Sequence, residues 1–137
     1  DGVHLAPDVI RMAMSTACPK RIALVTDAMS ATGQPDGDYI LGSLPVKVVD
    51  GRARLLAADG SLGAIAGSTL TMGRAVEFVT SVVGVPLGRV AVVAATTPAR
   101  IHGLDEVGAI EEGRWADLCL TDARGHLVRV VRRGETI

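Results

Sequence analysis

A short apolar run near the start of the chain most constrains its fold. Residues 21–27 read Arg-Ile-Ala-Leu-Val-Thr-Asp, an unbroken aliphatic stretch that ends in a carboxylate. It follows a segment that begins at Pro7, in which apolar residues recur at helical spacing (Ile10, Ala13, Met14 and Ala17). A strand without polar alternation is buried on both faces, and a preceding helix favours a parallel sheet. The sequence therefore predicts an α/β fold in which residues 21–27 form a fully buried parallel strand.

The composition excludes several classes of partner. Hydrophobic residues make up 48% of the chain but aromatic residues only 2%, so aliphatic side chains must build the core. A net charge of -1 gives no attraction to nucleic acid or to anionic membranes, and no apolar run is long enough to span a bilayer. The four arginines near the end are interpreted as one solvated strand face (Arg124, Arg129, Arg132 and Arg133).

The cysteines and the start of the sequence indicate the setting of the protein. Cys18 and Cys119 have no partners at metal-ligand spacing, which favours free, buried thiols in a cytoplasmic protein. The sequence begins at Asp1 with neither an initiator Met nor a signal peptide, so we expect it to be the interior of a longer protein.

Residues 28–67 differ in character, because glycines separate short β-prone pieces. Residues 45–49 can pair with residues 52–56 across Asp50-Gly51, a dipeptide favoured in tight hairpin turns. We interpret this region as a β-hairpin insertion.

The rest of the chain is expected to be helical until two final strands. Ser68 or Thr69 can cap a helix that Gly84 ends, and further helices are predicted from Pro86 and from Thr97. Residues 117–121 and 127–131 alternate in polarity and predict an antiparallel pair.

Three places could carry chemistry. Asp27 ends the predicted strand, at the edge where βα folds place their active sites, and could act as a general base; a loop or helix-cap aspartate explains it equally well. His4 precedes the first helix, although from the residues alone a surface histidine is the simpler interpretation. The backbone amides around Gly67, before a helix, could bind an anion, but plain helix caps have the same pattern.

Two other kinds of site are disfavoured. Gly67-Ser68-Thr69 lacks the closing glycine of a nucleophile elbow. His102 and His126 are predicted to be structural, and neither forms a zinc motif with His4.

Five segments carry a resemblance to a known family. They are residues 1–4 (DGVH), 24–29 (LVTDAM), 66–72 (AGSTLTM), 97–100 (TPAR) and 108–118 (GAIEEGRWADL). In this order they resemble the N-acetylglucosamine-6-phosphate deacetylases of the amidohydrolase superfamily, over essentially the whole chain. The last segment is similar to many amidohydrolases, whereas the second and third are more specific to the deacetylases.

The resemblance implies a fold and an assembly. Residues 1–103 would be the C-terminal segment of a metal-dependent hydrolase (β/α)8 barrel that carries the hairpin insertion. Residues 104–137 would be the closing strands of a small β-sandwich domain. The complete enzyme would be a cytoplasmic homodimer.

The resemblance also implies a reaction, the hydrolysis of the acetamide of N-acetylglucosamine 6-phosphate to glucosamine 6-phosphate and acetate. Asp27 matches the family's general base and acid, which takes a proton from the metal-bound water and delivers it to the departing amine. The segment that contains His4 matches a contact near the sugar and its phosphate (Asp1, Gly2, Val3 and His4). Ile65, Ala66 and Gly67 match the loop that lies against the bound substrate.

The family's divalent metal, zinc or iron, is held by a glutamate and two histidines that would lie upstream of this chain. The chain would therefore supply the base but no metal ligand, and we expect it to be inactive alone and unable to hold zinc tightly. Two alternatives remain: another metal-dependent amidohydrolase of the cyclic amidase type, and a non-catalytic α/β binding module that folds by itself.

Overall fold

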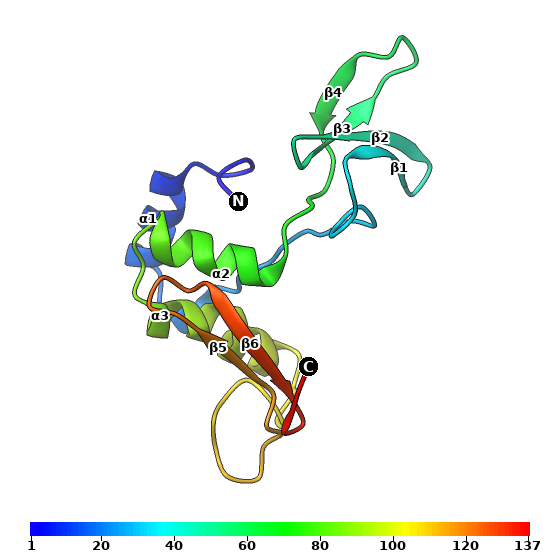
Figure 1. The fold of residues 1–137 in the computed structure, drawn as a ribbon. Coiled ribbons are helices and arrows are strands. Elements are labelled where there is room, and N and C mark those ends of the chain that lie inside the picture. Colours follow the sequence, from blue (N-terminus) through cyan, green and yellow to red (C-terminus); the bar gives the residue numbers. More distant parts are fainter. The chain divides into compact units, whose positions relative to one another are not determined.

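The computed structural model describes residues 1–137, the whole chain. It divides into two units (Figure 1): Asp1–Val25 with Met72–Ile137, and Thr26–Thr71. Each unit has a hydrophobic core of its own, built largely from small aliphatic side chains as the composition predicts. The division into barrel and small β domain at residue 103 stays a prediction.

The helices of the first unit begin where local signals place them, with one exception. Helix α1 (Pro7–Thr16) starts at Pro7 as predicted, because proline at the first helical position needs no N–H partner. Helix α2 (Met72–Ser81) begins later than expected. The predicted caps are wrong because the Ser68 hydroxyl accepts from Leu70 N and the Thr69 hydroxyl donates to Gly51 O.

A continuous helical run follows where two separate helices were expected. It comprises α3 (Leu87–Ala91), the π-helical segment η2 (Val92–Thr96) and α4 (Thr97–Ile101). The N–H of Thr97 donates to Val92 O, five residues back, and Pro98 has no N–H to give to Val93 O. Val93 O instead accepts a hydrogen bond from Leu24 N at 2.8 Å. The π-helical segment thus provides an acceptor for the chain that leads to Asp27.

The predicted buried parallel strand at residues 21–27 is wrong. A 3-10 turn, η1 (Pro19–Arg21), comes first, and the residues that follow form no strand. Ile22 and Leu24 pack against the core, but Val25 is 71% exposed. A parallel strand needs hydrogen-bonded neighbours, and the chain offers this segment no strand partner beyond an isolated bridge between Ala28 and Ser68.

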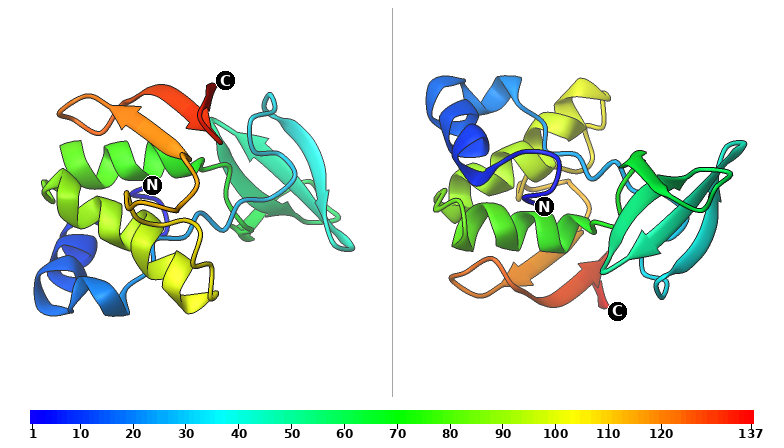
Figure 2. Two further views of the ribbon diagram at one scale, coloured as in Figure 1. Left: turned by 90° about the horizontal axis from the view of Figure 1, so that it is seen from below. Right: turned by 90° about the horizontal axis from the view of Figure 1, so that it is seen from above.

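The first unit ends in a small antiparallel sheet of β5 (Leu118–Thr121), β6 (Leu127–Arg132) and β7 (Glu135–Thr136). The predicted pair β5–β6 is confirmed, whereas β7 was not expected. The hairpin lies along α2, with α3 on the other side of that helix (Figure 2). The approach is close, since a Cβ on Gly125 would come within 2.9 Å of the Thr80 hydroxyl.

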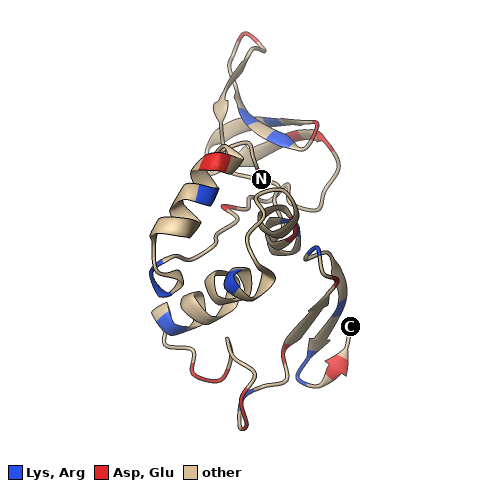
Figure 3. Ribbon diagram, turned by 90° about the vertical axis from the view of Figure 1, so that its left-hand side faces the viewer, with Lys and Arg blue, Asp and Glu red and all other residues tan.

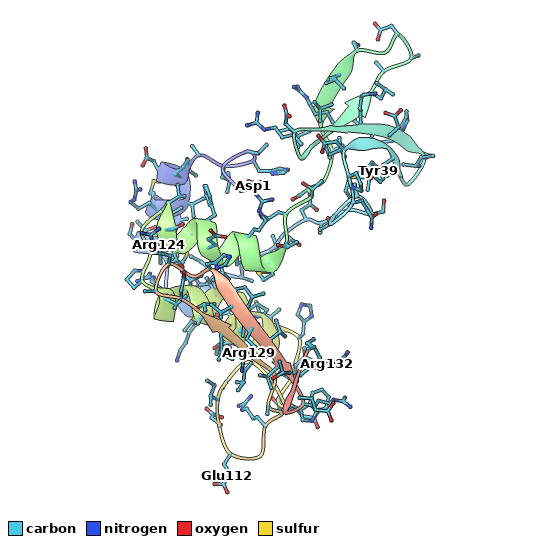
Figure 4. All side chains as sticks on the ribbon, in the orientation of Figure 1. Asp1, Tyr39, Glu112, Arg124, Arg129 and Arg132 are labelled. Carbon is cyan, nitrogen blue, oxygen red and sulfur yellow. The ribbon has the colours of Figure 1, made fainter.

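The arginines of this hairpin do not share one strand face. All are exposed, but Arg124 lies in the turn and Arg132 at the far end of β6 (Figure 4). Arg129 and Arg132 are three residues apart on one strand, so their side chains point to opposite sides of the sheet. Basic and acidic residues are interspersed along both units (Figure 3).

The second unit is an antiparallel sheet in the order β1 (Gly37–Leu41), β2 (Leu44–Val49), β3 (Arg52–Leu56) and β4 (Leu62–Ile65). The predicted hairpin is confirmed: Val49 pairs with Arg52, and both turn residues have positive φ, 51° at Asp50 and 67° at Gly51. Alternate residues of β2 and β3 join Met29, Ala31 and Ala66 in the core (Val46, Val48 and Ala53).

The cysteines are free, as predicted, but they are not buried. Both Cys18 and Cys119 are exposed, because no other element of the chain covers the residue before η1 or this side of β5. None of the helices combines the length and apolar character that a membrane crossing requires.

Candidate functional site

Asp27 has an exposed side chain on an uncommon backbone conformation. Its φ of 53° lies in the left-handed region, which Asp and Asn adopt more readily than other non-glycine residues. Its carbonyl oxygen accepts a hydrogen bond from Ser68 N at 2.9 Å. The carboxylate is therefore open to solvent while the backbone beneath it is held by a distant segment.

The backbone of Ser68 forms hydrogen bonds with the residues on both sides of Ala28. While Ser68 N donates to Asp27 O, Ser68 O accepts from Met29 N, also at 2.9 Å, which makes Ala28 and Ser68 a parallel bridge. Ser68 is only 4% exposed, and its hydroxyl accepts from Leu70 N at 2.8 Å. The structure thus brings Asp27 together with the loop of residues 65–67, two features that the sequence predicts separately.

The three loop residues contribute in different ways. Ile65 ends β4, pairs with Arg54 and is 42% exposed, so it is the large side chain that this loop offers. Ala66 faces the core and donates its N–H to Ala53 O. Gly67 has a φ of 65°, and a Cβ there would lie 3.5 Å from Asp27 O. Where this loop passes Asp27, it therefore presents its backbone and no side chain.

The segment around His4 is organised by Asp1 (labelled in Figure 4). One oxygen of the Asp1 carboxylate accepts from Val3 N and from His4 N, at 3.0 and 3.2 Å. The other lies 2.6 Å from His4 Nδ1. A carboxylate at this distance favours the proton on Nδ1, which leaves Nε2 available to a ligand.

Gly2 allows this segment to lie close to α2. Its φ is 71°, and a Cβ would come within 2.9 Å of the Phe78 ring. Asp1, Gly2, Val3 and His4 belong to the first unit, whereas Asp27, Ile65, Ala66 and Gly67 belong to the second. That the two groups line one substrate site stays a prediction.

Thr32 contacts the candidate site through hydrogen bonds that the sequence did not indicate. Its N–H donates to Met29 O at 3.0 Å, and its hydroxyl donates to Ser68 O at 3.2 Å. The sequence indicates a turn here only through Gly33, which follows Thr32. Its partner lies 36 residues away, however, so no local pattern could reveal the contact.

The residues of this chain do not fit a metal site. No three of its His, Cys, Asp and Glu side chains lie close enough together to hold a metal ion. His102 and His126 are exposed, and His126 N donates to the Asp122 carboxylate within the β5–β6 turn.

Known proteins of similar sequence are sugar-phosphate deacetylases, although the chain matches no protein-family model. It is 38% identical over 119 residues to an N-acetylglucosamine-6-phosphate deacetylase of Vibrio furnissii, a match that covers 86% of this chain and 28% of that protein. It is 34% identical over 137 residues to a putative N-acetylgalactosamine-6-phosphate deacetylase of Escherichia coli K12, covering 98% of this chain and 78% of that protein.

Solved structures agree. An N-acetylglucosamine-6-phosphate deacetylase of Thermotoga maritima matches with a TM-score of 0.84 and 39% identity, over 99% of this chain and 36% of that one. A deacetylase of Mycobacterium smegmatis matches with a TM-score of 0.87 and 38% identity, over 98% of this chain and 35% of that one. That structure has one aspartate replaced by alanine and N-acetyl-D-glucosamine-6-phosphate bound. The chain thus spans about a third of the solved relatives, and it belongs to the N-acetylglucosamine-6-phosphate deacetylase family.

Proposed function

We propose that this chain supplies the proton-transferring carboxylate of an enzyme that hydrolyses N-acetylglucosamine 6-phosphate to glucosamine 6-phosphate and acetate. The observation that carries the proposal is the exposed Asp27, whose left-handed backbone is hydrogen-bonded to the loop that contains Ala66 and Gly67. The names of the relatives give the substrate class, and one solved relative holds this sugar phosphate.

In this reaction Asp27 acts first as a base and then as an acid. Its carboxylate takes a proton as water adds to the acetamide carbonyl carbon. It then gives that proton to the amide nitrogen as the C–N bond breaks, so that a neutral amine and acetic acid leave, and the acid loses its remaining proton to water to become acetate. Because the anion of an amine is a very poor leaving group, the nitrogen must be protonated before the C–N bond breaks, and a positioned proton donor is needed for turnover.

Two groups of residues would bind the substrate. Ile65, Ala66 and Gly67 would lie against the sugar, and the missing side chain at Gly67 lets the backbone approach closely. His4, oriented by Asp1, would offer Nε2 as an acceptor to a hydroxyl of the sugar near its phosphate. Both assignments follow the family resemblance of these segments.

The complete enzyme would need groups that this chain does not supply. A divalent metal such as zinc or iron would act as a Lewis acid at the carbonyl, and no three donors within residues 1–137 fit it. We propose that its ligands lie outside these residues. We also propose that the chain completes a (β/α)8 barrel and a small β-sandwich domain, in a cytoplasmic homodimer.

A second substrate has direct support. Two relatives, both 34% identical over 98% of this chain, are named for N-acetylgalactosamine 6-phosphate. The two sugars differ only in the configuration at C4, so the same acetamide chemistry would serve both.

The experiment measures acetate release by the full-length protein that contains this chain, loaded with its metal. N-acetylglucosamine 6-phosphate is compared with its C4 epimer and with the sugar that lacks phosphate. Asp27→Asn should lower kcat by ~10²–10⁴-fold, the usual contribution of proton transfer. Asp105→Asn makes the same charge change at an exposed loop residue and should leave kcat unaltered. Near-normal turnover in Asp27→Asn would remove this residue from the mechanism.

A further inference from the structure

The backbone of Asp27 depends on the peptide groups of another segment. Its φ of 53° is uncommon for a residue with a side chain, and such conformations persist where surrounding contacts hold them. The contacts here are the two bonds of Ser68, one to Asp27 O and one from Met29 N. The orientation of the Ser68 backbone therefore determines the direction in which the Asp27 side chain points, and so do the contacts that hold Ser68 in place.

Thr32 fixes Ser68 from the side of the core. Its hydroxyl gives Ser68 O a second donor, at 3.2 Å, beside Met29 N. Its own N–H closes the turn that begins at Met29. That turn is anchored, because Met29 is 7% exposed and Ala31 is fully buried in the core of the second unit. The Thr32 hydroxyl thus connects a rigid turn to the loop that supports Asp27.

We propose that Thr32 is a positioning residue for proton transfer by Asp27, an inference that rests on the proposed role of Asp27. Without the hydroxyl, Ser68 O keeps only Met29 N as its partner and its peptide group can tilt. The Asp27 backbone, bonded to the same residue, would move with it. Proton transfer depends steeply on the placement of the donor and acceptor, so small displacements lower the rate without unfolding the protein.

The first experiment removes the hydroxyl and keeps the shape of the side chain. In the full-length, metal-loaded protein, Thr32→Val should lower kcat about tenfold, equivalent to about 1.4 kcal/mol of barrier. KM should stay within about twofold, since substrate contacts are retained. Thr32→Ser keeps the hydroxyl and should restore kcat to near the parent value. If Thr32→Val does not fold, Thr32→Ala removes the same hydrogen bond with a smaller side chain.

A second substrate separates positioning from simple loss of active protein. In the ester analogue, an oxygen replaces the acetamide nitrogen. The alkoxide that leaves from the ester needs protonation far less than the amine anion that would leave from the amide. The defect of Thr32→Val should therefore shrink on the ester, as should that of Asp27→Asn. A loss of folded protein would lower both rates equally.

The possible results are distinct. Two results would overturn the role of Thr32: a parent-like kcat in Thr32→Val, or a defect of that variant that is equal on amide and ester. If Asp27→Asn is inactive in the same experiments, the proposed function still stands. A fully active Asp27→Asn overturns the role of Asp27 and the inference about Thr32 with it. A defect in Thr32→Val that serine repairs and the ester diminishes supports both.

Discussion

Gly67 is the residue at which the predicted substrate loop passes closest to Asp27. An added Cβ would lie 3.4 Å from Met29 Cβ and 3.5 Å from Asp27 O, and the φ of 65° is itself unfavourable for alanine. We expect Gly67→Ala to cost about 1–2 kcal/mol of unfolding free energy from backbone strain alone. It should also lower kcat, because the loop must shift against Asp27.

Gly60 provides the matched control for this substitution. Its φ of 82° imposes similar strain, but nothing lies within 4 Å of an added Cβ. Gly60→Ala should therefore lower the melting temperature of the full-length protein without changing kcat. Equal kcat values for the two alanine variants would contradict the role given to the loop.

Asp122 makes the β5–β6 turn sensitive to acid. Hydrogen bonds from His126 N and then Arg124 N hold the pKa of its carboxyl below the ordinary value of 3.8. Because the folded pKa is depressed, the stabilisation is present above pH 3.8 and is lost as the pH falls through the folded value. We expect amide exchange in this turn to accelerate, beyond its intrinsic pH dependence, below about pH 4.

Asp122→Asn tests the cause of that acid response, since asparagine cannot titrate. The variant should show no such step, and an unchanged step would assign the acid response to another group. Asp59, whose pKa is lowered by the hydroxyl and then the N–H of Ser61, should respond in the same direction in its own turn.

At the scale of the helix, Pro98 leaves the carbonyl oxygen of Val93 without a donor from the π-helical segment. Without an N–H at residue 98, Val93 O is left to accept from Leu24 N. Pro98→Ala adds a competing donor inside the helix, so we expect faster amide hydrogen exchange at Leu24. Pro86→Ala, at the N-cap of α3, is the control and should leave that exchange unchanged. Unaltered protection of Leu24 in Pro98→Ala would refute this explanation.

The elements that could be predicted from the sequence are those with local signals. Pro7 fixes the start of α1, and Asp50-Gly51 supplies the two positive φ angles of the β2–β3 turn. The strand predicted at residues 21–27 failed because strand formation depends on partners elsewhere, and the chain provides none. The cap of α2 was misplaced because the hydroxyls of Ser68 and Thr69 bond within the loop.

The same distinction applies to the site. Asp27 and the loop at Gly67 could be found because each belongs to a recognisable motif. The bridge from Ala28 to Ser68 and the support from Thr32 join residues more than 30 positions apart, so only the fold reveals them. Local motifs thus pointed to the proposed base, whereas the contacts that hold its backbone could be found only in the structure.

At the scale of the whole molecule, residues 1–137 contain the proposed base without a group of three metal donors. We therefore expect the isolated chain to bind no stoichiometric zinc and to release no acetate. Equilibrium dialysis followed by metal analysis checks the first expectation. One tightly held zinc ion per chain would show that metal ligands exist within these residues.

Several large apolar side chains of the chain are exposed, among them Ile110 at 89% and Val25 at 71%. Exposed apolar surface of this kind favours association. Any assay on the isolated chain therefore needs its state of association measured alongside the metal content.

The most direct test of the central claim is a crystal structure of the full-length Asp27→Asn variant with N-acetylglucosamine 6-phosphate bound. The proposed mechanism predicts the side chain of residue 27 within about 3.2 Å of the acetamide nitrogen or of the water placed to attack its carbonyl. It also predicts the backbone of residues 65–67 against the sugar. A bound substrate whose acetamide faces a different carboxylate, with residue 27 out of hydrogen-bonding reach, would contradict the claim.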